Sequence, residues 1–356
     1  MIPGDIAAEL TAILRGAAAA GELPSQAGAM TAAGTWRRVP AAAGGGAGSY
    51  ATSLPFALAR CSGRSPAELA TMLAARLSGA PGVGAASATG GYLTVTVTDR
   101  VLTSLAIRMA AAGPGCASSG ALADTRQPAP PEPDVAAAVS WSQAWRWQTG
   151  AVTARLAAAA GAIIIPSAKP DIRPVQAPPP GHSPVTVAIE YAGLDAVRYA
   201  LTRTAASRAG AMGRLICVSH DRENPFYAVS LAHAEAAATL RWACDLQLPR
   251  GRPNALAAGA LDHPRERRLL DALSWLPERV AGAARRRQPH ELAAYLEGLA
   301  GAWFDCRESC PALPFGGLRA PRDGDSIKAR LWLADAARTV FATGLALIGV
   351  ACPERL

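Results

Sequence analysis

The residue types that could act as nucleophiles, general bases or metal ligands are scattered along this chain. None of the histidines begins an H-E-x-x-H motif, and none lies beside a recognisable nucleophile elbow. Cys306 and Cys310 have the spacing of helical neighbours, and no second cysteine or histidine pair lies nearby in the sequence. We therefore predict structural cysteines, no metal site and no catalytic residue of these classes. The five histidines are His182, His220, His233, His263 and His290.

The lysines exclude a phosphate-binding P-loop. Such a loop needs a Gly-Lys pair, because the glycine backbone cradles the phosphates and the lysine reaches them. The chain has two lysines, Lys169 after Ala168 and Lys328 after Ile327. The glycine-rich run at residues 44–48 precedes a helix signal without a buried strand before it. That run is typical of a flexible loop rather than of a dinucleotide fingerprint.

The composition limits the class of protein. A chain of 356 residues predicts two or three domains. The net charge of +8 permits a polyanionic partner without requiring one. All but two of the 35 basic residues are arginine, which together with the many alanines indicates a GC-rich coding sequence, so arginine enrichment alone is not counted toward RNA binding. Apolar runs shorter than about 20 residues predict no transmembrane helix, and the seven scattered cysteines and the N-terminus predict a reduced cytoplasm.

Three segments follow from the periodicity. Residues 1–101 combine a helix at 4–20, an extended stretch at 35–40, a helix at 50–60, a capping box at Ser65–Glu68 and an alternating strand at 92–98, which predicts an α+β domain. Residues 102–192 are rich in proline, and we predict a shortened, irregular α/β segment with a helix near 139–160 and a strand at 185–191. Residues 193–356 carry helical stripes throughout, which predicts an all-α bundle.

Two stretches of sequence carry a family resemblance. The run from Glu223 to Glu235 is similar to the motif Glu-Asn-Pro-x-Tyr-x-Val-Gln-Tyr-Ala-His-Ala-Arg of arginyl-tRNA synthetases, with departures at Ser230, Leu231 and Glu235. Residues 193–199 and the end of the chain also resemble this family's anticodon-binding domain, known as the DALR type. In the N-terminal segment, residues 49–55 and 90–94 resemble the family's additional N-terminal domain. The resemblance covers roughly residues 1–100 and 190–356.

The signatures of the family's catalytic domain are absent from the sequence. None of the five histidines starts an H-x-G-H signature, which holds the phosphates of ATP, and two lysines 159 positions apart exclude a Lys-x-x-Lys loop. About 90 residues separate the two matching ends, which is too few for the family's nucleotide-binding fold. We therefore expect a synthetase-related chain without catalytic residues or a cofactor.

The resemblance also implies RNA contacts. On the strand, Tyr92 and Thr94 match the aromatic and amide positions that read the D-loop corner of tRNA, although a half-buried structural role is the alternative for Tyr92. In the bundle, the resemblance points to the helix containing Tyr295, Trp303 and Arg307 and to residues 353–356, while spacing alone assigns Tyr295 and Trp303 to the core.

Two clusters have no counterpart in the resemblance. Arg285, Arg286 and Arg287 lie at a predicted helix end, where they suit phosphate contacts or a solvated terminus stabilised by the helix dipole. The tryptophans at 141, 145 and 147 predict packing of the middle segment against the bundle, or a patch for a protein partner.

Three hypotheses about function follow. The first is a noncatalytic synthetase paralogue that binds tRNA, with arginine tRNA as one candidate, or a tRNA-like RNA. The second is an arginine-tRNA ligase, which would need ATP. The third is a protein scaffold or regulator built on the anticodon-binding bundle.

Overall fold

The computed structural model describes residues 2–32, 35–39, 46–130, 134–166, 183–206, 216–252, 256–257, 259–313 and 324–356. Part of the glycine-rich run, His182 and Lys169 lie outside these ranges. The chain divides into two compact units, each built from segments far apart in the sequence. Unit 1 comprises residues 1–108, 249–278 and 309–333, and unit 2 comprises residues 109–248, 279–308 and 334–356. The domain boundaries at 101 and 192 therefore stay a prediction.

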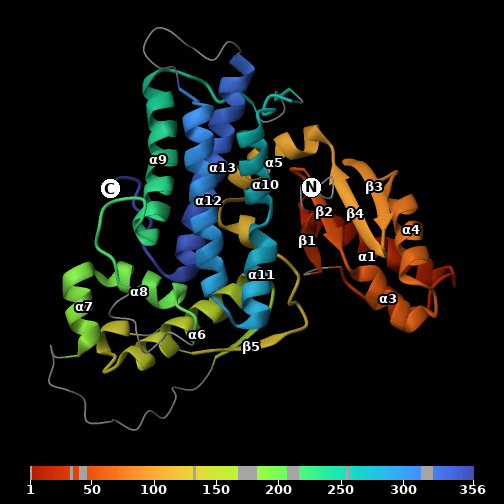
Figure 1. Ribbon diagram of the computed structural model, residues 1–356, viewed down its shortest axis with the longest axis horizontal. Coiled ribbons are helices and arrows are strands. Elements are labelled where there is room, and N and C mark those ends of the chain that lie inside the picture. Colours follow the sequence, from red (N-terminus) through yellow and green to blue (C-terminus); the bar gives the residue numbers. More distant parts are fainter. Residues whose placement is uncertain are drawn as a thin grey trace. The chain divides into compact units, whose positions relative to one another are not determined.

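Unit 1 begins with a four-stranded antiparallel sheet and the helices that pack on it (Figure 1). The spatial order of the strands is β1-β2-β4-β3. Their bounds are β1 Trp36–Arg38, β2 Ser49–Thr52, β3 Val83–Thr89 and β4 Tyr92–Val97. The helices are α1 Pro3–Ala19, α2 Ser25–Gly28, α3 Leu54–Ser62, α4 Pro66–Leu77 and α5 Asp99–Ala112. The predicted α+β fold is confirmed, although residues 50–60 are split between β2 and α3 because Pro55 favours the first turn of a helix that starts later.

The capping box that starts α4 is present as predicted. The Ser65 hydroxyl accepts a hydrogen bond from the Glu68 backbone N–H at 3.2 Å, and the Glu68 carboxylate accepts from the Ser65 N–H at 3.0 Å. These bonds to Ser65 also lower the pKa of Glu68. With its start fixed, α4 places Leu69, Leu73 and Leu77 against β3 and β4, where all three are fully buried.

Helix α10 (Pro264–Ser274) joins unit 1 through polar contacts with β2 and the residues before it. The Asp271 carboxylate lies 2.7 Å from the Arg38 guanidinium and accepts a hydrogen bond from the Gly48 N–H at 3.3 Å. The Tyr50 hydroxyl donates to Ser274 Oγ at 3.1 Å. Burial raises the pKa of Asp271, while Arg38 and the Gly48 N–H act in the opposite direction. The carboxylate therefore links residues more than 220 positions apart in the sequence.

Unit 2 contains a βαβ element followed by helices. Strands β5 (Arg126–Ala129) and β6 (Ile163–Pro166) are parallel, and α6 (Trp141–Ala159) connects them. Two short 3₁₀ helices, η2 (Gly113–Ala117) and η3 (Val135–Ala137), flank β5. The later helices of unit 2 are α7 Pro184–Ala192, α8 Leu194–Arg203 and α9 Pro225–Asp245. Most of α11 (Leu276–Arg286) and α12 (His290–Ser309) and the second part of α13 (Gly324–Ile348) also belong to unit 2, whereas residues 276–278 and 324–333 belong to unit 1.

The strand predicted at residues 185–191 is wrong, because these residues form α7. Valine, threonine and isoleucine favour a strand. However, Ser183 accepts a hydrogen bond from the Thr186 N–H at 3.0 Å, and Pro184 occupies the first helical position. The start signal of the helix and the packing of Val185 in the core outweigh the β propensity.

The predicted all-α bundle is confirmed in the C-terminal half, where α9, α12 and α13 lie side by side (Figure 1). Close approach of α12 and α13 depends on Gly344, since a Cβ there would lie 2.5 Å from Leu296. By length and composition α13 could cross a membrane, but 72% of its most apolar window is buried in the protein. A core helix passes the same test, so this is weak support for a membrane span.

We expect Asp271→Ala to destabilise the protein by about 1–3 kcal/mol, because the buried Gly48 N–H loses its acceptor. Asp271→Asn keeps an acceptor oxygen without the buried charge, so its loss should be clearly smaller. Urea unfolding of the three proteins checks this. Equal losses for the two variants would show that the charge, not the acceptor, holds α10 in place.

Candidate nucleic-acid interface

Tyr92 starts β4 and presents an exposed aromatic ring in unit 1. Its side chain is 45% exposed, and its ring lies 4.9 Å from that of Phe56 on α3, tilted by 58°. Gly91 makes this contact possible, because a Cβ there would lie 2.9 Å from the Phe56 ring. Thr94, two residues along the strand, points to the same face and is partly buried. Two rings therefore form one aromatic surface, which we call the Tyr92–Phe56 platform.

Sequence reasoning did not identify Phe56. The residue lies within a helical pattern, and nothing in that pattern distinguishes an exposed phenylalanine from a core one. Its proximity to Tyr92 follows from the packing of α3 on β4. Only the tertiary structure brings these two rings together.

The arginine triplet lies at the end of α11, and all three side chains are exposed. Arg287 has a left-handed backbone conformation with φ of 55°, and the N–H of Gln288 bonds the carbonyl of Ala283 at 2.9 Å. This is the Schellman arrangement that ends a helix. Arg286 forms a two-bond ion pair with Glu291, which raises the pKa of Arg286. Within the described residues, Arg285 and Arg287 form no ion pair.

The predicted residues on α12 are more enclosed. Trp303 is only 4% exposed, and its Nε1 donates a hydrogen bond to Glu235 on α9 at 3.4 Å. Arg307 forms an ion pair with the same carboxylate at 3.5 Å. Tyr295 is partly buried. The Trp303 position agrees with its core alternative and leaves its ring without an open face for a base.

Glu235 is a site residue whose role the sequence did not reveal. It was noted as a departure from the arginine of the resembling motif, but its contacts depend on α9 packing against α12. The carboxylate neutralises Arg307, one of the predicted RNA contacts. The charge available on this part of the bundle is therefore smaller than the sequence suggests.

The residues that carried the motif resemblance have definite structural roles. Asn224 caps α9, since its side-chain oxygen accepts from the N–H groups of Phe226 and Tyr227, and Pro225 occupies the first turn. His233 is buried, and its Nδ1 lies 3.1 Å from the carbonyl oxygen of Pro353. Burial is the main cause that lowers the pKa of His233. The motif therefore begins α9 and positions the C-terminal segment.

The predicted tryptophan cluster packs inside unit 2. Trp141, Trp145 and Trp147 are partly buried against a core formed by residues of η3, α6, α7 and α8. The Trp145 Nε1 donates to the carbonyl of Thr204 at 2.9 Å. These contacts support the packing interpretation, and a role in binding a protein partner stays a prediction.

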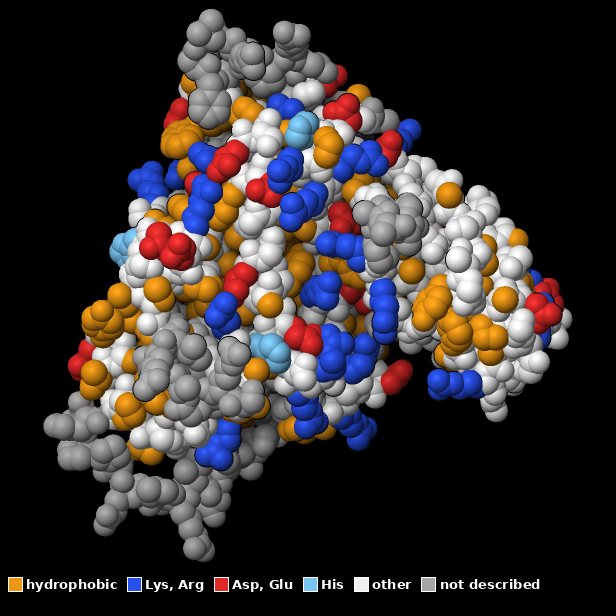
Figure 2. Space-filling model, in the orientation of Figure 1, with side chains coloured by type: hydrophobic (Ala, Val, Ile, Leu, Met, Phe, Trp, Pro, Cys, Tyr) orange, Lys and Arg blue, Asp and Glu red, His pale blue; other side chains and the backbone are white. Residues whose placement is uncertain are grey.

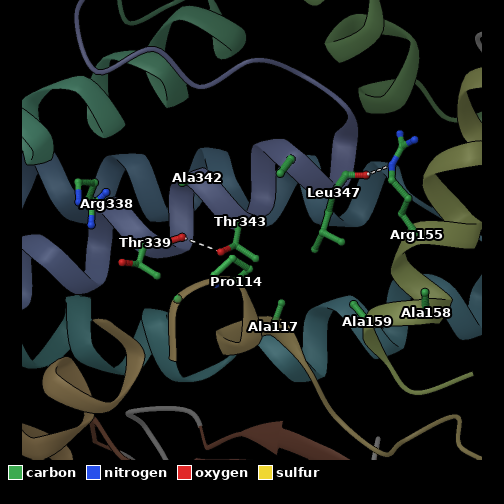
Figure 3. Close-up of a pocket in the computed structure, with 12 residues that line it drawn as sticks. Pro114, Ala117, Arg155, Ala158, Ala159, Arg338, Thr339, Ala342, Thr343 and Leu347 are labelled. Carbon is green, nitrogen blue, oxygen red and sulfur yellow. Dashed lines mark hydrogen bonds between the residues drawn. The ribbon is translucent and has the colours of Figure 1, made fainter. Parts of the chain in front are cut away.

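A pocket of about 650 Å³ lies between η2, α6 and α13 (Figure 3). Five of its twelve lining residues are alanine, and Arg155 and Arg338 are the cations. Arg155 donates to the carbonyls of Leu347 and Ile348, and Arg338 pairs with Asp335. Because both guanidinium groups already bind partners within the protein, the pocket offers little to an anionic ligand. In the described part of the chain no cluster of three or more metal-ligating side chains occurs.

Comparisons with known proteins match part of this chain. Residues 230–356 match the DALR anticodon binding domain family. Arginine–tRNA ligases of Clavibacter sepedonicus and Paenarthrobacter aurescens are each 38% identical over 168 residues, which is 47% of this chain and 29% and 30% of those proteins. The structure of Thermus thermophilus arginyl-tRNA synthetase is 23% identical, covers 65% of this chain and 34% of that one, and has a TM-score of 0.35.

This chain thus spans about 30% of the length of the ligases it matches. Residues 230–356 match the DALR anticodon binding domain family, and nearly half of the chain is similar in sequence to arginine–tRNA ligases.

Proposed function

We propose that this protein is a noncatalytic relative of arginyl-tRNA synthetases that binds tRNA, or a tRNA-like RNA, in the cytoplasm. The observation that carries the proposal is the match of residues 230–356 to the DALR anticodon binding domain. Arginine tRNA is the first candidate partner, because the similar proteins are arginine–tRNA ligases.

Two surfaces support RNA binding. The Tyr92–Phe56 platform offers exposed aromatic rings, on which an unpaired base can stack. Arg285 and Arg287 offer exposed guanidinium groups for phosphates at the end of α11. On the face shown in Figure 2, basic side chains lie among acidic ones over the helices, so we expect phosphate contacts to be few and local.

The noncatalytic part of the proposal rests on the sequence and on the βαβ element. No histidine begins an H-x-G-H signature, and the two lysines are far apart. Among the described residues, β5 and β6 are the only parallel pair, whereas a nucleotide-binding sheet places its ligand where several parallel strands end. On this proposal the protein needs no cofactor.

A ligase activity is the second candidate, favoured by the 38% identity to arginine–tRNA ligases. It would require ATP and arginine. We expect no ATP–pyrophosphate exchange with arginine, with or without tRNA, in an assay where a known arginine–tRNA ligase serves as the positive control. Exchange above background that depends on arginine would establish the ligase instead.

We expect tRNA binding to weaken sharply between about 50 and 200 mM salt. The double variant Arg285→Ala/Arg287→Ala should reduce the slope of log affinity against log salt by about 1.5, since each lost phosphate contact removes 0.7–0.9. Filter binding or fluorescence anisotropy with total tRNA and arginine tRNA measures this.

The matched control is Arg60→Ala/Arg146→Ala, which removes two exposed charges elsewhere in the chain. A similar slope change in both double variants would mean that only net charge matters. No binding by the wild-type protein even at low salt would contradict the proposed function and favour the protein-scaffold hypothesis.

We expect Tyr92→Ala to weaken tRNA binding by about 1–3 kcal/mol, the usual contribution of one stacked base. Tyr92→Phe keeps the ring and should bind nearly as well as wild type. Because Tyr92 is 45% exposed, both variants should fold, which circular dichroism checks. Wild-type affinity in the alanine variant would exclude the Tyr92–Phe56 platform from the interface.

A further inference from the structure

One face of α13 forms a wall of the pocket shown in Figure 3. Thr339, Ala342, Thr343 and Ala346 line it, and their spacing of three and four residues places them on the same side of the helix. The facing walls come from η2 and from the end of α6, and every lining residue belongs to unit 2. We call this space the α13 pocket.

The small side chains of the lining leave the α13 pocket open to solvent. Ala342 is half-buried, whereas Ala346 on α13 and Ala158 on α6 are exposed. Across from them, Gly113 and Ala117 of η2 carry no side chain long enough to fill the space. The volume of about 650 Å³ lies within the range of about 300–1,000 Å³ that is usual for small-molecule sites. A ligand that covers these methyl groups would remove apolar surface from water.

Thr339 supplies a polar group without a partner in the α13 pocket. The residue is only 6% exposed, and its hydroxyl forms no hydrogen bond within the described residues. One turn further along α13, the Thr343 hydroxyl differs, because it donates to the Thr339 carbonyl at 2.8 Å and accepts from Cys116 Sγ at 3.5 Å. Buried hydroxyl groups are nearly always hydrogen-bonded in proteins. The Thr339 hydroxyl therefore has to find its partner inside the pocket.

The charges of the lining favour an uncharged ligand. Arg155 already donates to the carbonyls of Leu347 and Ile348, and Arg338 is paired with Asp335 at 2.9 Å. An anion would have to compete with these internal partners for the two guanidinium groups. No carboxylate lines the α13 pocket among the described residues, so a cationic ligand would find no opposite charge there.

The shape of the α13 pocket favours a chain over a ring. Thr339 lies towards one end of the pocket and Leu347 towards the other (Figure 3). The two residues are eight positions apart on α13, which corresponds to about 12 Å of helix. Within the described residues no aromatic side chain lines the pocket, so a flat ring would have no ring on which to stack. A flexible hydrocarbon chain, in contrast, can pack against a row of methyl groups.

We propose that the α13 pocket binds an uncharged aliphatic chain of the fatty-alcohol class. Its methylene groups lie along Ala342 and Ala346, and its terminal hydroxyl bonds the Thr339 hydroxyl. This site goes beyond the proposed function, because it involves neither RNA nor the residues expected to contact RNA.

The test uses the full chain and isothermal titration calorimetry with 1-octanol. Octanoate and octylammonium keep the chain but add a charge, and benzyl alcohol keeps the hydroxyl but replaces the chain with a ring. We expect saturable binding of 1-octanol, at least fivefold tighter than that of the other three probes. Tighter binding of octanoate would overturn the assignment of an uncharged ligand, and tighter binding of benzyl alcohol that of a chain.

Two variants that fill the α13 pocket test its location. Ala342→Leu and Ala346→Leu should each weaken 1-octanol binding at least tenfold, because the larger side chain occupies the space of the ligand. Ala294→Leu is the matched control, since Ala294 is exposed on α12 and does not line the pocket, so its affinity should be unchanged. Circular dichroism of the three variants checks that each is folded.

Thr339→Val tests the polar end of the α13 pocket. It should weaken 1-octanol binding severalfold without lowering the melting temperature of the free protein, because the hydroxyl that it removes has no partner there. Thr339→Ser keeps the hydroxyl and should bind 1-octanol nearly as well as wild type.

Two results would overturn the proposal as a whole. The first is the absence of saturable 1-octanol binding to the wild-type protein. The second is wild-type affinity in both folded variants that fill the α13 pocket, which would place the bound chain elsewhere.

Discussion

The packing of unit 2 depends on how the last carbonyl groups of α13 are hydrogen-bonded. A helix leaves its last carbonyl groups without partners, and the helix dipole makes that end negative. Here Arg155 of α6 donates to the carbonyls of Leu347 and Ile348, and Gln148 of the same helix also donates to Ile348 at 2.8 Å. Arg198 of α8 donates to Gly349 at 3.2 Å. Three side chains from the middle of the sequence thereby fix where the C-terminal segment leaves the bundle.

The position of the chain at the end of α13 determines the contacts of the residues that follow it. Gly349 adopts φ of 82° and ends α13, after which the backbone N–H of Ala351 bonds Asp195 and the carbonyl of Pro353 meets His233. The segment that follows α13 thus lies against α8 and α9 and forms one wall of a pocket of about 590 Å³ at the start of α9. A helix cap made by guanidinium groups therefore controls the shape of a surface formed by other residues. The pocket in Figure 3, which Arg155 and Leu347 help to line, lies beside the same cap.

The sequence predicted the elements whose signals are local. The predicted helix at residues 4–20 and strand at 92–98 agree with α1 and β4 within a residue or two. The capping box of α4 is present because the side chains of Ser65 and Glu68 each accept a hydrogen bond from the backbone N–H of the other residue, within one turn. The family resemblance of the C-terminal half agrees with the DALR match.

What the sequence did not reveal depends on contacts between distant segments. The pairing of Glu235 with Arg307 joins residues on two helices, and the Phe56 ring meets Tyr92 across α3 and β4. Periodicity assigns each of these residues to a face of its own element but does not say what that face meets. The start of α7 is a different case, because the local Ser183 cap and Pro184 act together with the packing of Val185 against the β propensity of residues 185–191. A count of charged and aromatic residues in the sequence therefore overestimates how many are available to bind a ligand, because some of them already bind other residues of the protein.

The middle segment has a structural role through helix α6. Two parallel strands bury little, and parallel sheets are normally covered on both faces, so β5 and β6 contribute little stability by themselves. Helix α6 between them, however, supplies Gln148 and Arg155 to the end of α13, and Trp145 to the carbonyl of Thr204 after α8. Removing this segment would leave carbonyl groups of two helix ends without partners. Its structural role is thus independent of any nucleotide chemistry, because α6 supplies the side chains that bind the last carbonyl groups of α13.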